Sequence, residues 1–228
     1  MNEATPELTG ATGVEHRART PVAGAIAGIL FAVLFSVAVM IIFTSMPAFS
    51  HGAGASLHAG AGRLKLAVAL VPFAGIFFLW FIAVARERLG RFEDQFFATV
   101  FIGSGLLFLA MTFAAAATAA AIIAVYTRNP SGFPGSTTYV YARSVVAQIF
   151  SVYALRMAAV FLISQATLWM RTHVMPRWMA LLTYVLALIL LFVFTQSSWV
   201  VLVFPGWVLM VSAYILVTHL AGSRPSGS

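Results

Sequence analysis

The amino-acid sequence predicts an all-α fold, a polytopic transmembrane helical bundle of six spans with both termini cytoplasmic. The 228 residues are 61% hydrophobic and only 8% charged, whereas soluble domains are about 45–50% apolar and about 25% charged. The apolar residues gather in six long runs, and a helix of ~20 apolar residues crosses a bilayer. These runs lack the two-residue alternation of a membrane β-barrel, so helices are the predicted spanning elements.

Each span is an apolar stretch bounded by polar or turn-forming residues. The spans are expected at Val22–Ser45, Leu64–Ala85, Phe96–Tyr126, Tyr139–Arg171, Trp178–Thr195 and Trp199–Leu220. Thr20 and Pro21 suit the start of the first helix, as a cap and a first helical residue. That run is also too long for the apolar core of a signal peptide, so we expect a permanent span. The third and fourth runs exceed the length that a bilayer requires, so these helices should tilt or protrude.

The polar ends predict the domain boundaries. Residues 1–20 carry three acids, two arginines and no periodic apolar face, which is typical of a disordered tail, here cytoplasmic. Residues 21–220 form the six-helix transmembrane domain. Residues 221–228 (AGSRPSGS) are expected to be a flexible C-terminal tail.

The orientation follows from the basic residues, which favour cytoplasmic loops. With the termini inside, eight basic residues lie inside: Arg17, Arg19, Arg86, Arg88, Arg91, Arg171, Arg177 and Arg224. Four lie outside: Arg63, Lys65, Arg128 and Arg143. In a soluble chain the net charge of +7 would suggest nucleic acid, but here topology accounts for it and no nucleic-acid partner is expected.

Arg156 is the one basic residue far from the ends of a predicted span, and it is the main candidate for a functional role. An arginine near the middle of a bilayer costs ~2.5–3.5 kcal/mol on insertion scales, and no intramembrane carboxylate is available to pair with it. One interpretation is an anion or headgroup site with Arg156, Tyr153, Gln148 and Ser164 as its lining. The other, which we favour, is a structural arginine that bonds backbone carbonyls or extends toward the inner loop.

The inner loop between the second and third spans contains the chain's densest cluster of charges. We expect an ion-pair network, with the two acids at the start of the third helix, formed by Arg86, Arg88, Arg91, Glu93 and Asp94. A catalytic carboxylate pair is the less favoured alternative, because no nucleophile or metal-ligand set lies nearby.

His51 and His58 lie in the glycine-rich outer segment 50–62 and are weak candidates for metal ligands. A metal site needs three or four ligands, and the predicted outer face offers no acid, no cysteine and no third histidine. We therefore favour solvated histidines and expect no metal and no other cofactor. Whether segment 46–62 stays in water or folds back as a re-entrant segment is left open.

The first span contains the small-residue motif Gly24-Ala-Ile-Ala-Gly28. Such a motif lets two helices approach closely, either within one chain or across a dimer. We favour packing within the chain.

Three stretches together resemble a family of small bacterial integral membrane proteins, common in actinobacteria, that has no assigned activity. They are Arg91–Leu106 (RFEDQFFATVFIGSGL), Val152–Phe161 (VYALRMAAVF) and Pro176–Tyr184 (PRWMALLTY). The resemblance covers most of the membrane region. It implies six spans and a bacterial cytoplasmic membrane, and it assigns no site.

The functional hypotheses depend largely on what the spans lack. The predicted spans hold no acid, and no histidine lies in the middle of one, which disfavours carboxylate proton relays and a haem held by two histidines. No phosphate-binding glycine loop or catalytic triad is recognisable, so we expect no enzyme. The leading hypothesis is an accessory or structural partner of a membrane complex, contacting lipid and either another membrane protein or its own copies. The alternative is a small carrier or permeation pathway for an anionic or amphiphilic solute, with Arg156 as the anion contact.

Overall fold

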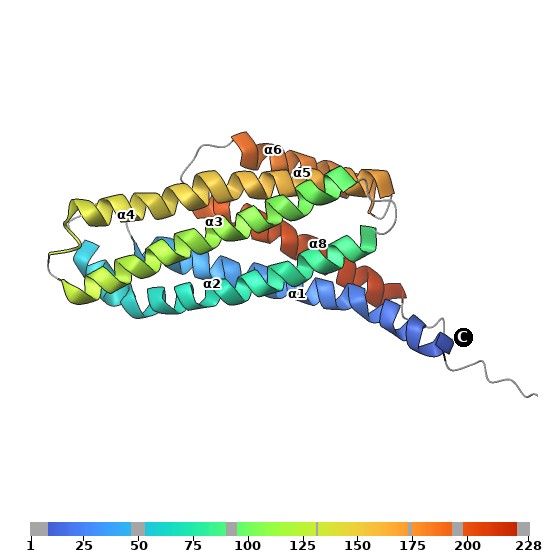
Figure 1. The fold of residues 1–228 in the computed structure, drawn as a ribbon, viewed down its shortest axis with the longest axis horizontal. Helices are drawn as coiled ribbons and strands as arrows, with labels where there is room; N and C mark the ends of the chain where they lie inside the picture. Colours follow the sequence, from blue (N-terminus) through green and yellow to red (C-terminus); the bar gives the residue numbers. More distant parts are fainter. Residues whose placement is uncertain are drawn as a thin grey trace, which may run out of the picture.

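The structure, a computed structural model, describes residues 9–46, 53–89, 95–130, 132–172, 175–192 and 198–222. Within these ranges every regular element is helical, so the all-α prediction is confirmed (Figure 1). The elements in order are α1 (Thr9–Ser45), α2 (Ala53–Leu89), α3 (Gln95–Arg128), α4 (Thr137–Gln148), the π-helix η2 (Ile149–Ala154), α5 (Leu155–Thr172), α6 (Arg177–Phe192), α7 (Ser198–Val201) and α8 (Val203–Gly222).

Five stretches of the described helices are long and apolar enough to cross a membrane. They are Val22–Ser45, Gly60–Glu87, Phe96–Arg128, Thr137–Thr172 and Trp199–His219. They correspond to five of the six predicted spans, and this part of the prediction is confirmed. The stretch predicted as the fifth span forms α6, which has 16 residues and a length of about 24 Å at 1.5 Å per residue.

Two boundaries differ from those expected. Helix α1 begins at Thr9, so helical backbone extends into the segment assigned to the N-terminal tail. Helix α2 begins at Ala53, so the glycine-rich segment contributes its first turns. Residues 1–8, 47–52 and 223–228 lie outside the described ranges.

The helices pack as antiparallel neighbours around a shared aromatic centre. Helix α3 runs beside the long α4–η2–α5 segment, and α6 packs against α5 at one end of the bundle (Figure 1). Six buried phenylalanines from five helices contact one another, with ring centroids 4.6–6.4 Å apart. This phenylalanine cluster consists of Phe31, Phe35, Phe78, Phe108, Phe161 and Phe204.

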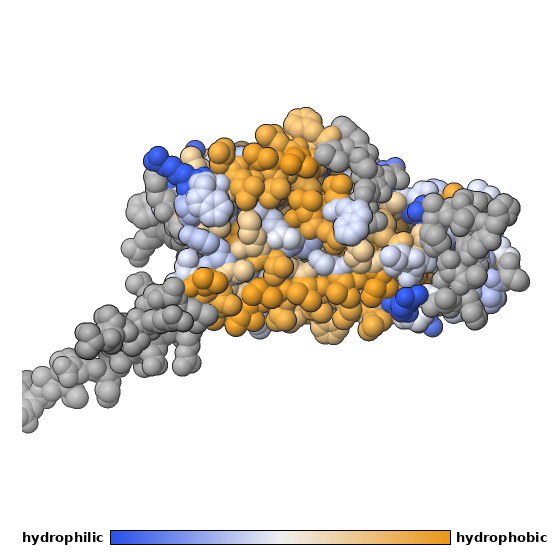
Figure 2. Space-filling view, turned by 180° about the vertical axis from the view of Figure 1, so that it is seen from behind, coloured by the Kyte–Doolittle hydropathy of each residue, from blue (hydrophilic) through white to orange (hydrophobic). Residues whose placement is uncertain are grey.

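The outside of the bundle is apolar as well. Figure 2 shows a broad hydrophobic belt with hydrophilic residues at both ends of the molecule. Large side chains in this belt are exposed, among them Phe73 at 57% and Trp80 at 61%. A soluble protein could not leave so much apolar surface in water, so the belt is the surface of a multi-pass membrane protein in contact with lipid.

One turn of the fourth predicted span is wider than an α-helix. The helical run Thr137–Thr172 is continuous, but Ile149–Ala154 forms a π-helix. The amide of Leu155, at its end, donates to both the Phe150 and Val152 carbonyls. Single π turns often mark functional sites and bend the helix that contains them. Arg156 directly follows Leu155, whose amide makes the last hydrogen bonds of the π-helix.

Candidate functional site

Arg156 lies near the middle of the bundle, about 20 Å along its helix from Arg143 and about 22 Å from Arg171 at 1.5 Å per residue. Its side chain is partly buried, and Nη1 donates a hydrogen bond of 2.8 Å to the Val152 carbonyl in the π-helix. Val152 therefore accepts from the guanidinium as well as from the amide of Leu155. This geometry is the carbonyl contact that the structural interpretation expects.

The other three residues predicted around Arg156 point in different directions. Tyr153 is 57% exposed on the outer surface, and Gln148 is exposed as well. Ser164 is buried, and its hydroxyl donates to the Val160 carbonyl of its own helix over 2.9 Å. None of these residues, nor Arg156, lines either of the two hollows described below.

Two buried hydroxyls lie at the level of the π-helix. Phe101 of α3 stacks on Phe161 of α5 with centroids 4.6 Å apart. Thr112 and Ser151 lie about three turns further along these antiparallel helices, toward the end of the bundle that holds Arg143. Both side chains are buried, and neither hydroxyl has a hydrogen-bond partner among the described residues. Neither residue stands out in the sequence, because isolated Ser and Thr are common in membrane helices.

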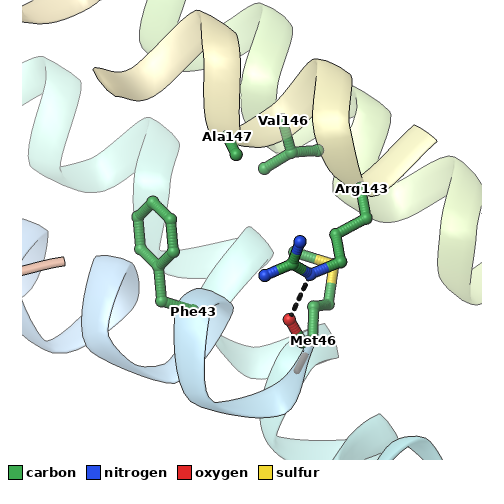
Figure 3. Close-up of a pocket in the computed structure, with 5 residues that line it drawn as sticks. All are labelled: Phe43, Met46, Arg143, Val146 and Ala147. Atoms are coloured by element: carbon green, nitrogen blue, oxygen red, sulfur yellow. Dashed lines mark hydrogen bonds between the residues drawn. The ribbon is translucent and has the colours of Figure 1, made fainter. Parts of the chain in front are cut away.

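A second arginine, Arg143 of α4, forms the polar side of a small hollow at the α3–α4 end of the bundle. Its Nε donates a hydrogen bond of 2.8 Å to the backbone carbonyl of Met46, just after the end of α1. A cation there also interacts favourably with the negative end of the α1 dipole. The hollow is about 10 Å³ in volume and is lined by Phe43, Met46, Arg143, Val146 and Ala147 (Figure 3).

A larger hollow lies on the outside of the bundle, between α1 and α8. Its volume is about 290 Å³, and its lining is apolar except for Ser36. The lining residues are Ala32, Val33, Ser36, Val37, Leu202, Pro205, Gly206 and Leu209. Because several of these side chains face outward, the hollow is a surface groove and does not lead into the bundle.

The remaining candidates fall largely outside the described part of the chain. Arg86 is exposed at the end of α2, and α3 begins at Gln95, directly after the two acids. Arg91, Glu93, Asp94 and His51 lie outside the described residues, as do the side chains of Arg88 and His58. The ion-pair network stays a prediction. Among the described residues, no group of three or more His, Cys, Asp or Glu side chains lies close enough together to hold a metal ion.

Buried polar groups are the features that sequence reasoning missed. Gln165 and Ser212 are buried with side-chain oxygens that lack a partner among the described residues. Ser212 faces Gly28 of α1, a contact that no local pattern indicates. From the sequence, Arg143 was counted only among the four basic residues expected outside. Its position at the edge of an apolar run, far from every acid, could have indicated a polar site.

Comparison of the chain with protein-family models, with curated proteins and with solved structures finds no match.

Proposed function

We propose that this chain is a non-enzymatic six-span protein of a bacterial cytoplasmic membrane, acting as an accessory or structural partner of a membrane complex. The observation that carries this proposal is the phenylalanine cluster, which fills the centre of the bundle from five helices. Aromatic pairs contribute about 0.5–1.5 kcal/mol each beyond the burial of their area. A centre of this kind favours a rigid scaffold over a path for a solute.

The six-span count is supported by how α6 lies along α8. Trp207 of α8 donates to Thr183 of α6 over 2.9 Å, and Trp178 meets Tyr214 with ring centroids 6.4 Å apart. The two helices are antiparallel, and α7–α8 is long enough to cross. Both contacts lie in the first turns of α6, which share the depth of the middle of α8, and this supports α6 as a sixth crossing. An even number of spans then leaves both termini on one side, which the basic residues favour as the cytoplasm.

The partner surface in this proposal lies within the membrane. The described helices turn apolar side chains outward around the belt, and the connecting segments are short. Contacts with another membrane protein, or with a second copy of this chain, would therefore form between helices. The hydrogen bond of Arg156 to its own helix supports a structural role for that residue, and the carrier alternative stays a prediction.

The experiment is gentle extraction of the tagged full chain from its host membrane, followed by native mass spectrometry. A photo-crosslinking residue is placed in turn at exposed positions on four helices: Val37, Phe73, Leu107 and Leu188. We expect a second polypeptide to co-purify in a fixed ratio to this chain. Crosslinks to it should form only from positions that neighbour one another on the surface of the bundle. Cells that make the untagged chain provide the control for non-specific capture.

Two outcomes contradict the proposal. A lone monomer with no crosslinked polypeptide from any of the four positions would rule out a stable partner. A retained small anion that disappears in Arg156→Ala would favour the carrier.

A further inference from the structure

The end of the bundle that holds Met46 carries positive charge that the chain itself does not neutralise. Arg63, Lys65 and Arg128 are exposed there, and Arg143 is partly buried. All six acidic residues lie within the first 15 residues or between positions 87 and 94, at the opposite ends of α1 and α2. The anions that balance these four cations must therefore come from outside the chain.

Arg143 differs from the other three cations because its guanidinium is held in place. The hydrogen bond from Nε to the Met46 carbonyl fixes the group between α4 and α1. Its two terminal nitrogens make no hydrogen bond with the described residues, and in Figure 3 one points across the hollow toward Phe43 and the other toward Val146. A guanidinium has several N–H groups to satisfy, and an acceptor oxygen placed in the hollow would gain hydrogen bonds from them.

The size of the hollow limits what the terminal nitrogens can accept. A volume of about 10 Å³ holds one water-sized group, so an entire phosphate does not fit, but one oxygen of a phosphate does. The rest of the anion would stay at the membrane surface. Guanidinium and phosphate form the strong, charge-assisted hydrogen bonds for which arginine is preferred over lysine.

The surroundings favour a lipid as the source of that phosphate. Phe43, Val146 and Ala147 give the hollow an apolar wall, and exposed apolar side chains such as Val37 of α1 and Leu66 of α2 lie on the neighbouring helices. A free phosphate would gain nothing from these contacts, whereas the acyl chains of a phospholipid would be in place beside them. We propose that the hollow at Arg143 binds the phosphate group of a membrane phospholipid, with one phosphate oxygen accepting from the terminal nitrogens.

The test measures lipid binding by the purified full chain in detergent, using native mass spectrometry during titration with phosphatidylglycerol. Diacylglycerol with the same acyl chains is the matched ligand without phosphate, and inorganic phosphate is the matched anion without chains. Two variants change the site: Arg143→Gln removes the cation, and Ala147→Leu occupies the hollow with a larger apolar side chain while the Arg143 cation is kept. Arg63→Gln removes an exposed cation at the same end of the bundle and serves as the control.

We expect wild type and Arg63→Gln to retain one more phosphatidylglycerol than either site variant, and the affinity of both site variants to be at least about tenfold weaker. Diacylglycerol should not be retained. If Arg143→Gln fails to fold, Ala147→Leu still decides the question. Equal retention by wild type and Ala147→Leu would overturn the proposal. Thermal stabilisation by inorganic phosphate as large as that by the lipid would overturn the assignment to a lipid.

Discussion

The indole of Trp207 donates a hydrogen bond of 2.9 Å from Nε1 to Oγ1 of Thr183, which joins α8 to α6 inside the bundle. Both side chains are buried. The Thr183 hydroxyl in turn donates to the Met179 carbonyl over 2.8 Å, and the indole stacks on Trp169 of α5 with centroids 5.8 Å apart. These contacts join α6, α8 and α5 inside the bundle.

Replacing Thr183 by Val should therefore destabilise the protein. The substitution removes the acceptor and leaves the indole N–H unpaired in an apolar interior. Interhelical hydrogen bonds in membranes average about 0.6 kcal/mol and reach about 1.7 kcal/mol, so we expect a loss within that range and a lower Tm. Thermal unfolding in detergent, followed by tryptophan fluorescence, measures it.

A matched control for that variant is Thr118→Val, because Thr118 is only partly buried and its hydroxyl bonds the Ala114 carbonyl of its own helix. Its stability should change by less than about 0.5 kcal/mol. Combining Thr183→Val with Trp207→Phe should cost less than the sum of the single changes, as for residues in direct contact. Equal losses in Thr183→Val and Thr118→Val would show that the interhelical bond contributes nothing.

The glycines of the first span should tolerate no side chain. A Cβ on Gly28 would collide with the Ser212 hydroxyl of α8 and come within 2.9 Å of the Phe81 ring, and a Cβ on Gly24 would collide with Val84 of α2. Packing of this motif within the chain is thus confirmed. We expect Gly28→Ala to cost about 1–3 kcal/mol, the usual effect of overpacking, measured as a lower Tm in detergent.

Gly103→Ala provides the comparison for that variant. Gly103 also lies inside a helix, but a Cβ there would meet nothing within 4 Å. Alanine should leave stability unchanged or raise it by up to about 1 kcal/mol, because it is the better helix former. If both variants behave alike, close approach at Gly28 is not limiting.

Hydropathy alone predicted the helical bundle and five of its spans, for a physical reason. In lipid every backbone N–H and C=O group must be bonded within its own segment, so a long apolar run such as Val22–Ser45 has little choice but to form a helix. The packing role of Gly28 was predictable on the same basis, because small residues in membrane helices mark close contacts.

What escaped prediction depends on contacts between distant parts of the chain. The bond from Arg143 to Met46 joins residues 97 positions apart, and no local pattern shows which helix ends meet. The π-helix Ile149–Ala154 contains neither proline nor glycine, so nothing in its sequence marks the wide turn. Tyr153 was placed beside Arg156 by helical spacing, but the structure leaves it exposed.

Removing the side chain of Arg156 tests whether this residue is structural. Its bond to Val152 has a charged donor, and such bonds contribute about 1.5–3 kcal/mol. Because the bond lies within one helix, the helix keeps part of its stabilising energy after the bundle unfolds into separate helices. We expect Arg156→Ala to lower stability by about 1 kcal/mol, equally with and without added anionic solutes in thermal unfolding. Unchanged stability together with loss of an anion-induced shift would instead support the carrier hypothesis.

The chain has no cysteine, so single cysteines can map its topology without background labelling. Thr138, Arg177, Trp199 and Thr218 are exposed positions near helix ends. With six spans and cytoplasmic termini, cysteines replacing Thr138 and Trp199 should react with an impermeant maleimide in intact cells. Cysteines replacing Arg177 and Thr218 should react only after permeabilisation. Labelling at position 218 from outside would mean that α6 does not cross, because α8 would then end on the other side. Protection at position 199 in intact cells, with position 218 reacting only after permeabilisation, would place the turn between α6 and α8 below the membrane surface.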